Sequence, residues 1–178
     1  MKRMKMNLQS FAGRADGALI ERKYLAHYID AAFDLTGAAT DYVRLGKDLE
    51  DYNVEMNPDV ETTKNIWGES RTKVKGYEPE GDVETFYAYE GEALYEKLFA
   101  IVNNRSTGAE LETTVVDVLI DSDGTVVKAY RENAVIVPQS IGGDTAGMQI
   151  PFNIYYNGDR TEGTWMVGTK KFTPTAEG

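Results

Sequence analysis

The chain has 178 residues and a mass of 19.8 kDa, which fits a single domain or one domain with an arm, and its hydrophobic fraction of 42% is enough for a packed core. The absence of cysteine excludes disulfides, thiolate metal sites and a cysteine nucleophile, and the single histidine, His27, excludes a site built from several imidazoles. The formal charge of -10 repels nucleic acid in bulk and disfavours anionic membranes.

The N-terminal third of the sequence contains few clear elements. Residues 1–10 lack the apolar segment of a signal peptide, and no apolar run approaches the roughly 18 residues of a membrane span, so we expect a soluble, intracellular protein. Residues 22–33 are apolar both at helical spacing and at alternate positions, which leaves helix and strand open. Residues 53–57 alternate between polar and apolar side chains, as in a short strand.

A polar stretch follows from residue 57 to residue 81, and it contains three glycines and two prolines. A connection of this length is uncommon in a compact domain unless it carries a function. Within it, Ile66 and Trp67 either cap the core or serve as anchors for a partner protein, and the pattern favours neither.

Acidic residues are concentrated in the middle of the chain. Residues 78–96 contain seven acidic side chains and no basic one. Such a run is typical of a solvated face, and it also suits a functional negative surface. The apolar and aromatic alternation from Val83 to Tyr89 predicts a strand inside this acidic region.

One helix is predicted from Glu92 to Asn103. Leu94, Leu98 and Ile101 recur at helical spacing, and acidic residues in the first turn complement the helix dipole. The width of this apolar stripe indicates a helix that packs on a sheet and covers the core.

The C-terminal half has the patterns of strands. Residues 113–120 and 125–131 are rich in β-branched side chains on either side of a turn sequence, and residues 134–137 continue the extended pattern. Residues 148–156 alternate clearly, with Pro151 indicating an edge or a bulge. The pair Asn157-Gly158 suits a tight hairpin turn, with residues 163–167 as the return strand. The sequence therefore favours a mostly β protein.

No local motif predicts catalysis, a metal site or a cofactor. The segment from Asp121 to Glu132 resembles a calcium loop only superficially, because its sixth position is Val126 and its flanks are β-rich. The sequence Gly142-Gly143-Asp144 lacks the lysine and the helix of a phosphate-binding loop. We therefore expect a protein that is not an enzyme and that uses no cofactor.

Several short segments occur in a fixed order between Arg22 and Val167, namely Arg22–Leu25, His27–Asp30, Tyr42–Asp48, Val54–Pro58, Gly142–Asp144, Ile154–Asp159 and Gly163–Thr164. Taken in this order, they resemble the major tail proteins (tail tube proteins) of tailed phages of Gram-positive hosts and of their prophages. The resemblance lies in the ordered set of segments more than in any single motif.

The resemblance implies a mainly β (α+β) subunit of β-sandwich or barrel-like form, with one flanking helix at about 92–103 and a long inter-strand loop. It implies homohexameric rings that stack into a tube, in which DNA passes through an acidic lumen without specific binding. Expected partners are further copies of the chain, the tape measure protein and the tail terminator, with no membrane. The expected location is the virion, after assembly in the host cytoplasm, and residues 22–30 become a strand.

The resemblance also implies an arrangement along the chain. We expect a flexible N-terminal arm over residues 1–21, the tail tube domain over residues 22–168, and a flexible C-terminal tail over residues 169–178. The long connection at residues 57–81 is expected to be a loop or hairpin that reaches the adjacent ring. The candidate contact residues in it are Asp59, Glu61, Lys64, Asn65, Ile66 and Trp67.

Two other functions remain open from the sequence. The first is an acidic β-sandwich binding module of a phage structure, which binds a carbohydrate or a receptor through an exposed aromatic platform. Its candidate residues are Tyr87, Tyr89, Tyr155 and Tyr156. The second is a hydrolase with a pair of carboxylates, although nothing in the sequence singles out a pair.

Overall fold

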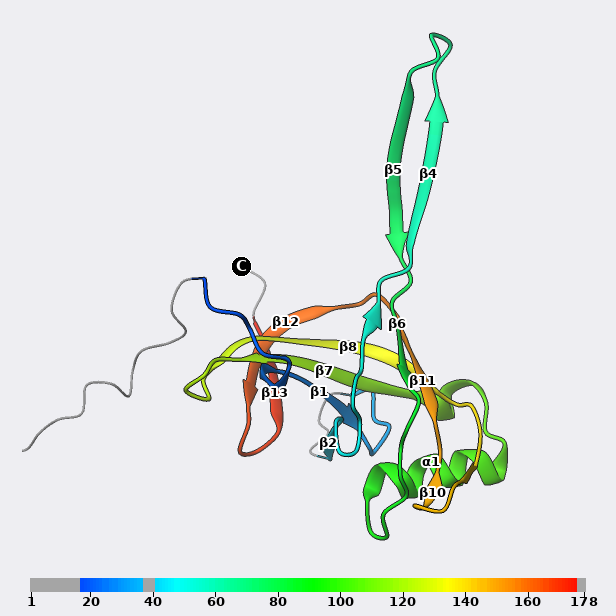
Figure 1. The fold of residues 1–178 in the computed structure, drawn as a ribbon, viewed down its shortest axis with the longest axis vertical. Helices are drawn as coiled ribbons and strands as arrows, with labels where there is room; N and C mark the ends of the chain where they lie inside the picture. The colour runs from blue at the N-terminus through cyan, green and yellow to red at the C-terminus, as the bar shows by residue number, and fades with distance from the viewer. Residues whose placement is uncertain (1–16, 37–40, 176–178) are drawn as a thin grey trace, which may run out of the picture.

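The computed structural model describes residues 17–36 and 41–175, and this part of the chain is mostly β-structure with a single α-helix (Figure 1). Nine strands form one antiparallel sheet in the order β2-β1-β7-β8-β11-β6-β3, with β12 paired to β8 and β13 paired to β12. The expected fold class, mainly β with one flanking helix, is confirmed. The strands of this sheet are β1 Leu25–Asp30, β2 Tyr42–Arg44, β3 Val54–Glu55, β6 Glu80–Val83, β7 Glu112–Ile120, β8 Val126–Pro138, β11 Phe152–Tyr156, β12 Thr161–Met166 and β13 Lys171–Pro174.

Smaller elements surround this sheet. Strands β4 (Pro58–Lys64) and β5 (Ser70–Tyr77) form one separate two-stranded ladder, and β9 (Gly142–Gly143) and β10 (Met148–Gln149) form another. Short 3-10 turns cover Arg22–Tyr24 and Gly108–Leu111. No helix within the described ranges has the length and apolar character needed to cross a membrane.

The sheet is buried on both faces, with one apolar cluster on each. Neighbouring residues of one strand point to opposite faces, so Val115 of β7 joins the first cluster while Val116 joins the second. In β1 the same division places Ile29 in the first cluster and Tyr28 in the second. This double burial is why the apolar pattern of residues 22–33 fitted both helix and strand. The strand implied by the family resemblance over residues 22–30 is confirmed for Leu25–Asp30, whereas Arg22–Tyr24 form a 3-10 turn.

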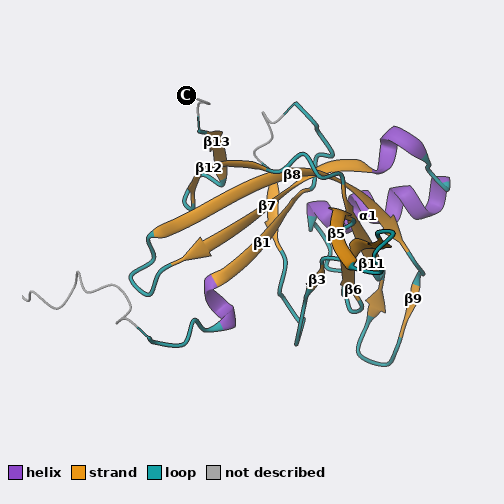
Figure 2. Cartoon of the chain, turned by 90° about the horizontal axis from the view of Figure 1, so that it is seen from above, coloured by secondary structure: helices purple, strands orange, loops and turns teal. Residues whose placement is uncertain are grey.

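The first cluster is covered by α1, which spans Ala93–Asn104 and confirms the predicted helix. Its Leu94 and Leu98 are fully buried because they share the face that packs against the sheet. The helix ends at Arg105 in the left-handed conformation, where the backbone N–H of Arg105 donates to Val102. Figure 2 shows α1 at the opposite end of the sheet from the β12–β13 hairpin.

The long strand β8 organises the C-terminal half. Along one edge it pairs with β7, and along the other it pairs first with β12 and then with β11. The predicted hairpin at Asn157-Gly158 is therefore wrong, since β11 and β12 follow one another along the same edge. Tyr156 pairs with Ala134 and Thr161 with Arg131, so two extra residues form a bulge between the strands.

Two predicted strand boundaries also need correction. The strand predicted from Val83 to Tyr89 is wrong except at Val83, because strand β6 spans Glu80–Val83 and the chain leaves the sheet after it. Phe86 is buried in the core and packs against Phe152 with ring centroids 5.5 Å apart. The alternating segment 148–156 is interrupted before Phe152, where Pro151 has no N–H to donate. Strand β11 lies between β8 and β6, so it is not at an edge.

The sheet continues beyond the expected boundary at residue 168. Strand β13 pairs with β12, and buried Phe172 lies opposite buried Trp165. Apolar burial thus holds part of the segment that was expected to be a flexible tail. Residues 1–16, most of the expected N-terminal arm, lie outside the described residues, as do residues 176–178.

Candidate functional site

Strands β4 and β5 form a hairpin that projects from the body of the protein (Figure 1). Within the two strands Gly76 alone is partly buried, and every other residue is exposed. The connection at residues 57–81, predicted as a loop or hairpin, is thus a hairpin. Its strands lack apolar alternation because neither face packs on the core, which is the condition that produces such a pattern.

The tip of the hairpin is a defined turn. The side-chain oxygen of Asn65 accepts from the backbone N–H groups of Trp67, at 3.0 Å, and of Glu69, at 2.9 Å. The Asn65 amide nitrogen donates to the Glu69 carboxylate at 2.7 Å. These bonds hold Ile66 and Trp67 at the extremity, where their exposed fractions are 97% and 80%. Exposed apolar side chains on an ordered turn are typical of a contact with another protein.

The two faces of the hairpin differ in chemistry. On one face, Glu61 pairs in register with Lys73 and forms an ion pair with Lys75 at 3.3 Å. On the other face, Val60 lies opposite Val74, and the hydroxyls of the next pair, Thr62 and Thr72, are 3.1 Å apart. The hairpin therefore presents a charged face and an apolar, threonine-containing face.

All six predicted contact residues lie on this hairpin. Asp59, Glu61 and Lys64 belong to β4, while the other three form the turn, where Asn65 shapes the backbone. The sequence analysis missed the basic side chains of β5, although their alternate spacing was visible in the sequence. They are Arg71, Lys73 and Lys75.

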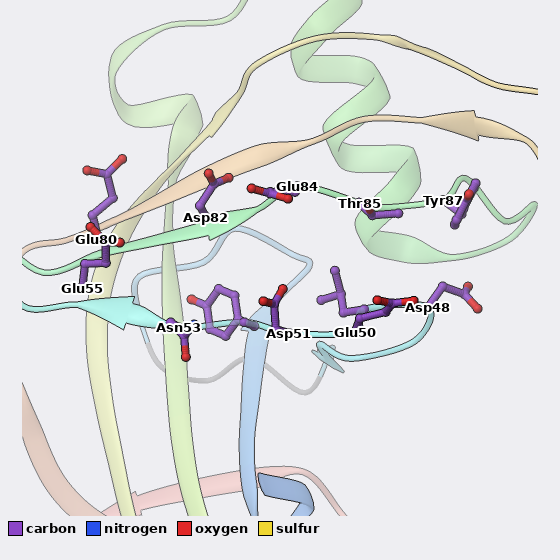
Figure 3. Close-up of a pocket in the computed structure, with 12 residues that line it drawn as sticks. Asp48, Glu50, Asp51, Asn53, Glu55, Glu80, Asp82, Glu84, Thr85 and Tyr87 are labelled. Atoms are coloured by element: carbon purple, nitrogen blue, oxygen red, sulfur yellow. The ribbon is translucent and has the colours of Figure 1, made fainter.

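An acidic groove of about 560 Å³ lies below the hairpin, between the segments 48–55 and 80–87. Figure 3 shows the two segments side by side, held together where Val54 pairs with Gly81 and Glu55 with Glu80. In the described part of the chain no basic side chain lines it. The acidic run at residues 78–96 predicted only the side of the groove that residues 80–87 form. The acidic residues that line the groove are Asp48, Glu50, Asp51, Glu55, Glu80, Asp82 and Glu84.

A second cavity, which we call the basal pocket, has a volume of about 660 Å³. It lies at the base of the hairpin, because Met56 precedes β4 and Tyr77 ends β5. Several of its apolar side chains are exposed, including Met56 at 50% and Tyr77 at 56%. The pocket is bounded by Leu25, Val54, Met56, Tyr77 and Pro79, with Tyr52 and Tyr156 also lining it.

One wall of the basal pocket is a charged network in which His27 and the two carboxylates are buried and Arg160 is exposed. His27 Nδ1 lies 2.7 Å from Asp117 Oδ1, and Arg160 Nη1 lies 2.9 Å from the other oxygen of Asp117. Arg160 also approaches Glu132 at 3.4 Å, and Glu132 accepts the backbone N–H of Gly158 at 2.8 Å. Both carboxylates are therefore compensated by donors, which suits a structural wall. Asp117 is 90 residues away from His27 along the chain, so no local sequence pattern could predict this pair.

The pKa values of this wall follow from burial and charge. Burial would raise the pKa of Asp117, but the hydrogen bond from His27 and the charges of His27 and Arg160 hold it below its usual value. Burial raises the pKa of Tyr52 to about 12, and burial with the neighbouring Tyr52 and Asp117 raises that of Tyr156. The two hydroxyls lie 3.1 Å apart. Both tyrosines therefore stay neutral at physiological pH and form a structural pair.

The structure gives no support to the aromatic platform of a binding module. Tyr156 is buried, whereas Tyr155, its neighbour on β11, points to the other face and is 39% exposed. Tyr87 and Tyr89 lie beyond the end of β6. The four tyrosines therefore do not share one solvent-facing surface.

The calcium-like sequence at Asp121 forms a hairpin turn. The backbone N–H of Asp121 donates to Thr125 at 2.7 Å, and that of Gly124 donates to Asp121. Among residues 17–36 and 41–175, no group of three or more His, Asp or Glu side chains is placed to hold a metal ion.

Comparisons with known proteins show a similarity of fold to two solved structures. No family model matches the sequence, and no curated protein matches it. Among solved structures, the tube-terminating cap of the anti-feeding prophage is 12% identical, with a TM-score of 0.52 over 89% of this chain and 99% of that one. The sheath/tube terminator of an extracellular contractile injection system, PVC, in its extended state is 9% identical, with a TM-score of 0.53 over 84% of this chain and 100% of that one. The chain shares the fold of these two proteins.

Proposed function

We propose that the chain is a non-enzymatic structural subunit of a phage-tail-like tube, and that the β4–β5 hairpin contacts a neighbouring subunit. The observation that carries this proposal is the hairpin itself, which is exposed on both faces and ends in Ile66 and Trp67. A monomer gains no core packing from such an element. A neighbouring subunit would bury its tip.

The structural neighbours support the same role. The match with this chain covers 99% of one neighbour and 100% of the other. Both neighbours are named as terminators of a tube. They favour a second, narrower candidate, in which the chain closes the end of a tube and does not form its repeating rings. The family resemblance of the sequence favours the repeating ring, so the two candidates differ in whether assembly continues beyond one layer.

In either candidate we infer a hexameric ring around a lumen that conducts DNA. The net charge of -10 and the acidic groove support this inference, because negative walls repel phosphates and let DNA slide. Further partners are then the tape measure protein and the other tube proteins, and the location is the virion. The six contact candidates on the hairpin would face the adjacent ring.

Negative-stain electron microscopy of the purified protein over a concentration series tests the proposal. The matched control is a variant in which residues 59–76 are replaced by Asn-Gly, so that Pro58 and Tyr77 flank a two-residue turn. Tubes of uniform diameter support the repeating ring, and single rings that do not elongate support the terminator. Monomers at every concentration, or identical assemblies from the variant, would contradict a tube subunit that uses the hairpin.

A further inference from the structure

We propose that the hairpin tip of one copy occupies the basal pocket of a second copy. This inference rests on the proposed function and names the surface that receives the hairpin. The occupant is the turn that carries Ile66 and Trp67, and the receiving surface is the apolar pocket at the base of the next copy's hairpin.

The tip has the properties of a preformed anchor. Asn65 fixes the turn with two backbone bonds and one side-chain bond, so little conformational freedom is left to lose when the turn is buried. Trp67 is 80% exposed, and tryptophan is among the residues that most often dominate binding at interfaces.

The pocket is complementary to this anchor in polarity and size. Val54, Met56 and Tyr77 give it an apolar wall, and its volume of about 660 Å³ exceeds what two side chains need. The polar side of the pocket is already satisfied, because Asp117 and Arg160 bond to each other. An apolar occupant therefore covers exposed apolar surface and leaves the hydrogen bonds of these two residues in place.

The occupant must come from another copy. Strand β4 has seven residues, and a strand of this length spans about 23 Å at roughly 3.3 Å per residue. The tip thus lies a strand length away from the pocket of its own chain, whose wall includes Met56 just before β4. Each copy offers one tip and one pocket, so the contact is head-to-tail and repeats from copy to copy.

Charge favours the same pairing. The hairpin from Pro58 to Tyr77 has four basic and three acidic residues, whereas the whole chain has a charge of -10. The acidic groove with its seven carboxylates adjoins the basal pocket, since Tyr52 and Asn53 line both. A hairpin seated in the pocket brings the basic side chains of β5 close to this negative surface and lowers the repulsion between copies.

Two single substitutions test the hairpin tip and the basal pocket separately. Trp67→Ala removes the anchor and keeps the pocket, while Met56→Asp places a charge in the pocket and keeps the tip. We expect each variant alone to need a protein concentration at least about tenfold higher for assembly, measured by sedimentation velocity. The control is Met166→Asp, because Met166 is 52% exposed, lies at the far end of β12 and should assemble like the wild type.

Mixing the two variants gives the decisive result. One intact contact is possible, from the tip of the Met56→Asp protein to the pocket of the Trp67→Ala protein. The mixture should therefore form two-layer species at the wild-type concentration and should not elongate further. Absence of this rescue, or normal assembly of Met56→Asp alone, would overturn the pocket assignment.

Tryptophan emission reports on the same site. The difference between wild type and Trp67→Ala isolates the emission of Trp67, and this emission should shift to shorter wavelength on assembly of the wild type. An unshifted emission in assembled protein would also overturn the assignment. Failure of the wild type to assemble at all would instead contradict the proposed function, so the two failures are distinguishable.

Discussion

The nine-stranded sheet and the β4–β5 hairpin are both antiparallel β-structure, but they are stabilised in different ways. The sheet is buried on both faces by two apolar clusters, whereas the hairpin is exposed on both faces. The hairpin relies on its ladder, its turn and side-chain pairs such as Val60 with Val74. The body is thus stabilised by apolar burial on two faces, while the hairpin keeps its side chains exposed and adds none to either apolar cluster.

The sharpest test of this contrast replaces one isoleucine with alanine in each region and compares the two losses of unfolding free energy. Ile154→Ala removes a fully buried side chain of β11 and should lower the free energy of unfolding by about 2–5 kcal/mol. Ile66→Ala removes a side chain that is 97% exposed and should change the same quantity by less than about 0.5 kcal/mol. Urea denaturation measures both, and equal losses would contradict the division between body and hairpin.

The next effect concerns the charged wall of the basal pocket. Asp117→Asn removes charge-assisted bonds to His27 and Arg160 and should cost about 1.5–3 kcal/mol of unfolding free energy at neutral pH. Because the pKa of Asp117 is lowered in the folded state, this advantage of the wild type is complete above about pH 4 and is lost as the pH falls through the folded pKa.

Urea denaturation of both proteins at neutral and at acidic pH measures this dependence. A suitable comparison is Glu162→Gln, which breaks the exposed pair with Lys128 and should leave the free energy of unfolding almost unchanged, because solvent screens exposed ion pairs. A wild-type advantage over Asp117→Asn that persists unchanged at pH 2 would show that the carboxylate is not the stabilising group.

A smaller effect is expected where the hairpin joins the body. At Gly81 of β6 an added Cβ would lie 2.1 Å from the hydroxyl oxygen of Tyr52, which is buried and bonded to Tyr156. Gly81→Ala should therefore lower the free energy of unfolding by about 1–3 kcal/mol. Gly76→Ala on β5 meets no atom within 4 Å and should be tolerated. Equal thermal midpoints of the two variants would contradict the close packing at the hairpin base.

Only a small effect on stability is expected from the largest change in sequence. Replacing residues 59–76 with Asn-Gly removes most of the hairpin but no residue of either apolar cluster. Unfolding free energy should change by less than about 1 kcal/mol, because surface elements outside the core contribute little. Circular dichroism during heating measures this, and a large loss would show that the hairpin also supports the body.

The sequence predicted those elements whose signal lies within one continuous segment of the chain. Helix α1 and the strands β7 and β8 follow directly from spacing and β-branched content. The bulge at Asn157-Gly158 could not be predicted, because the same dipeptide suits a tight hairpin turn. Only the pairing of β11 and β12 with β8 decides between a bulge and a turn. Strands β4 and β5 left no apolar alternation because no core lies against them.

The candidate site could be predicted in part. Ile66 and Trp67 are apolar residues in a polar stretch, and this contrast marks them in the sequence alone. The basal pocket could not be found in this way, because residues as distant as Leu25, Met56 and Arg160 meet only in the folded chain. The side of the acidic groove at residues 48–55 was missed for the same reason. Strand β3 pairs with β6, but the whole β4–β5 hairpin separates the two strands along the chain.

Hydrogen–deuterium exchange on the monomeric and the assembled protein tests most directly whether the hairpin is an element of assembly. We expect slower exchange on assembly in the hairpin, residues 58–77, and in the segment 52–56 beside the basal pocket, while the amides of β7 and β8 stay equally protected in both states. Equal exchange of residues 58–77 in monomer and assembly would contradict the claim that a neighbouring subunit covers the hairpin.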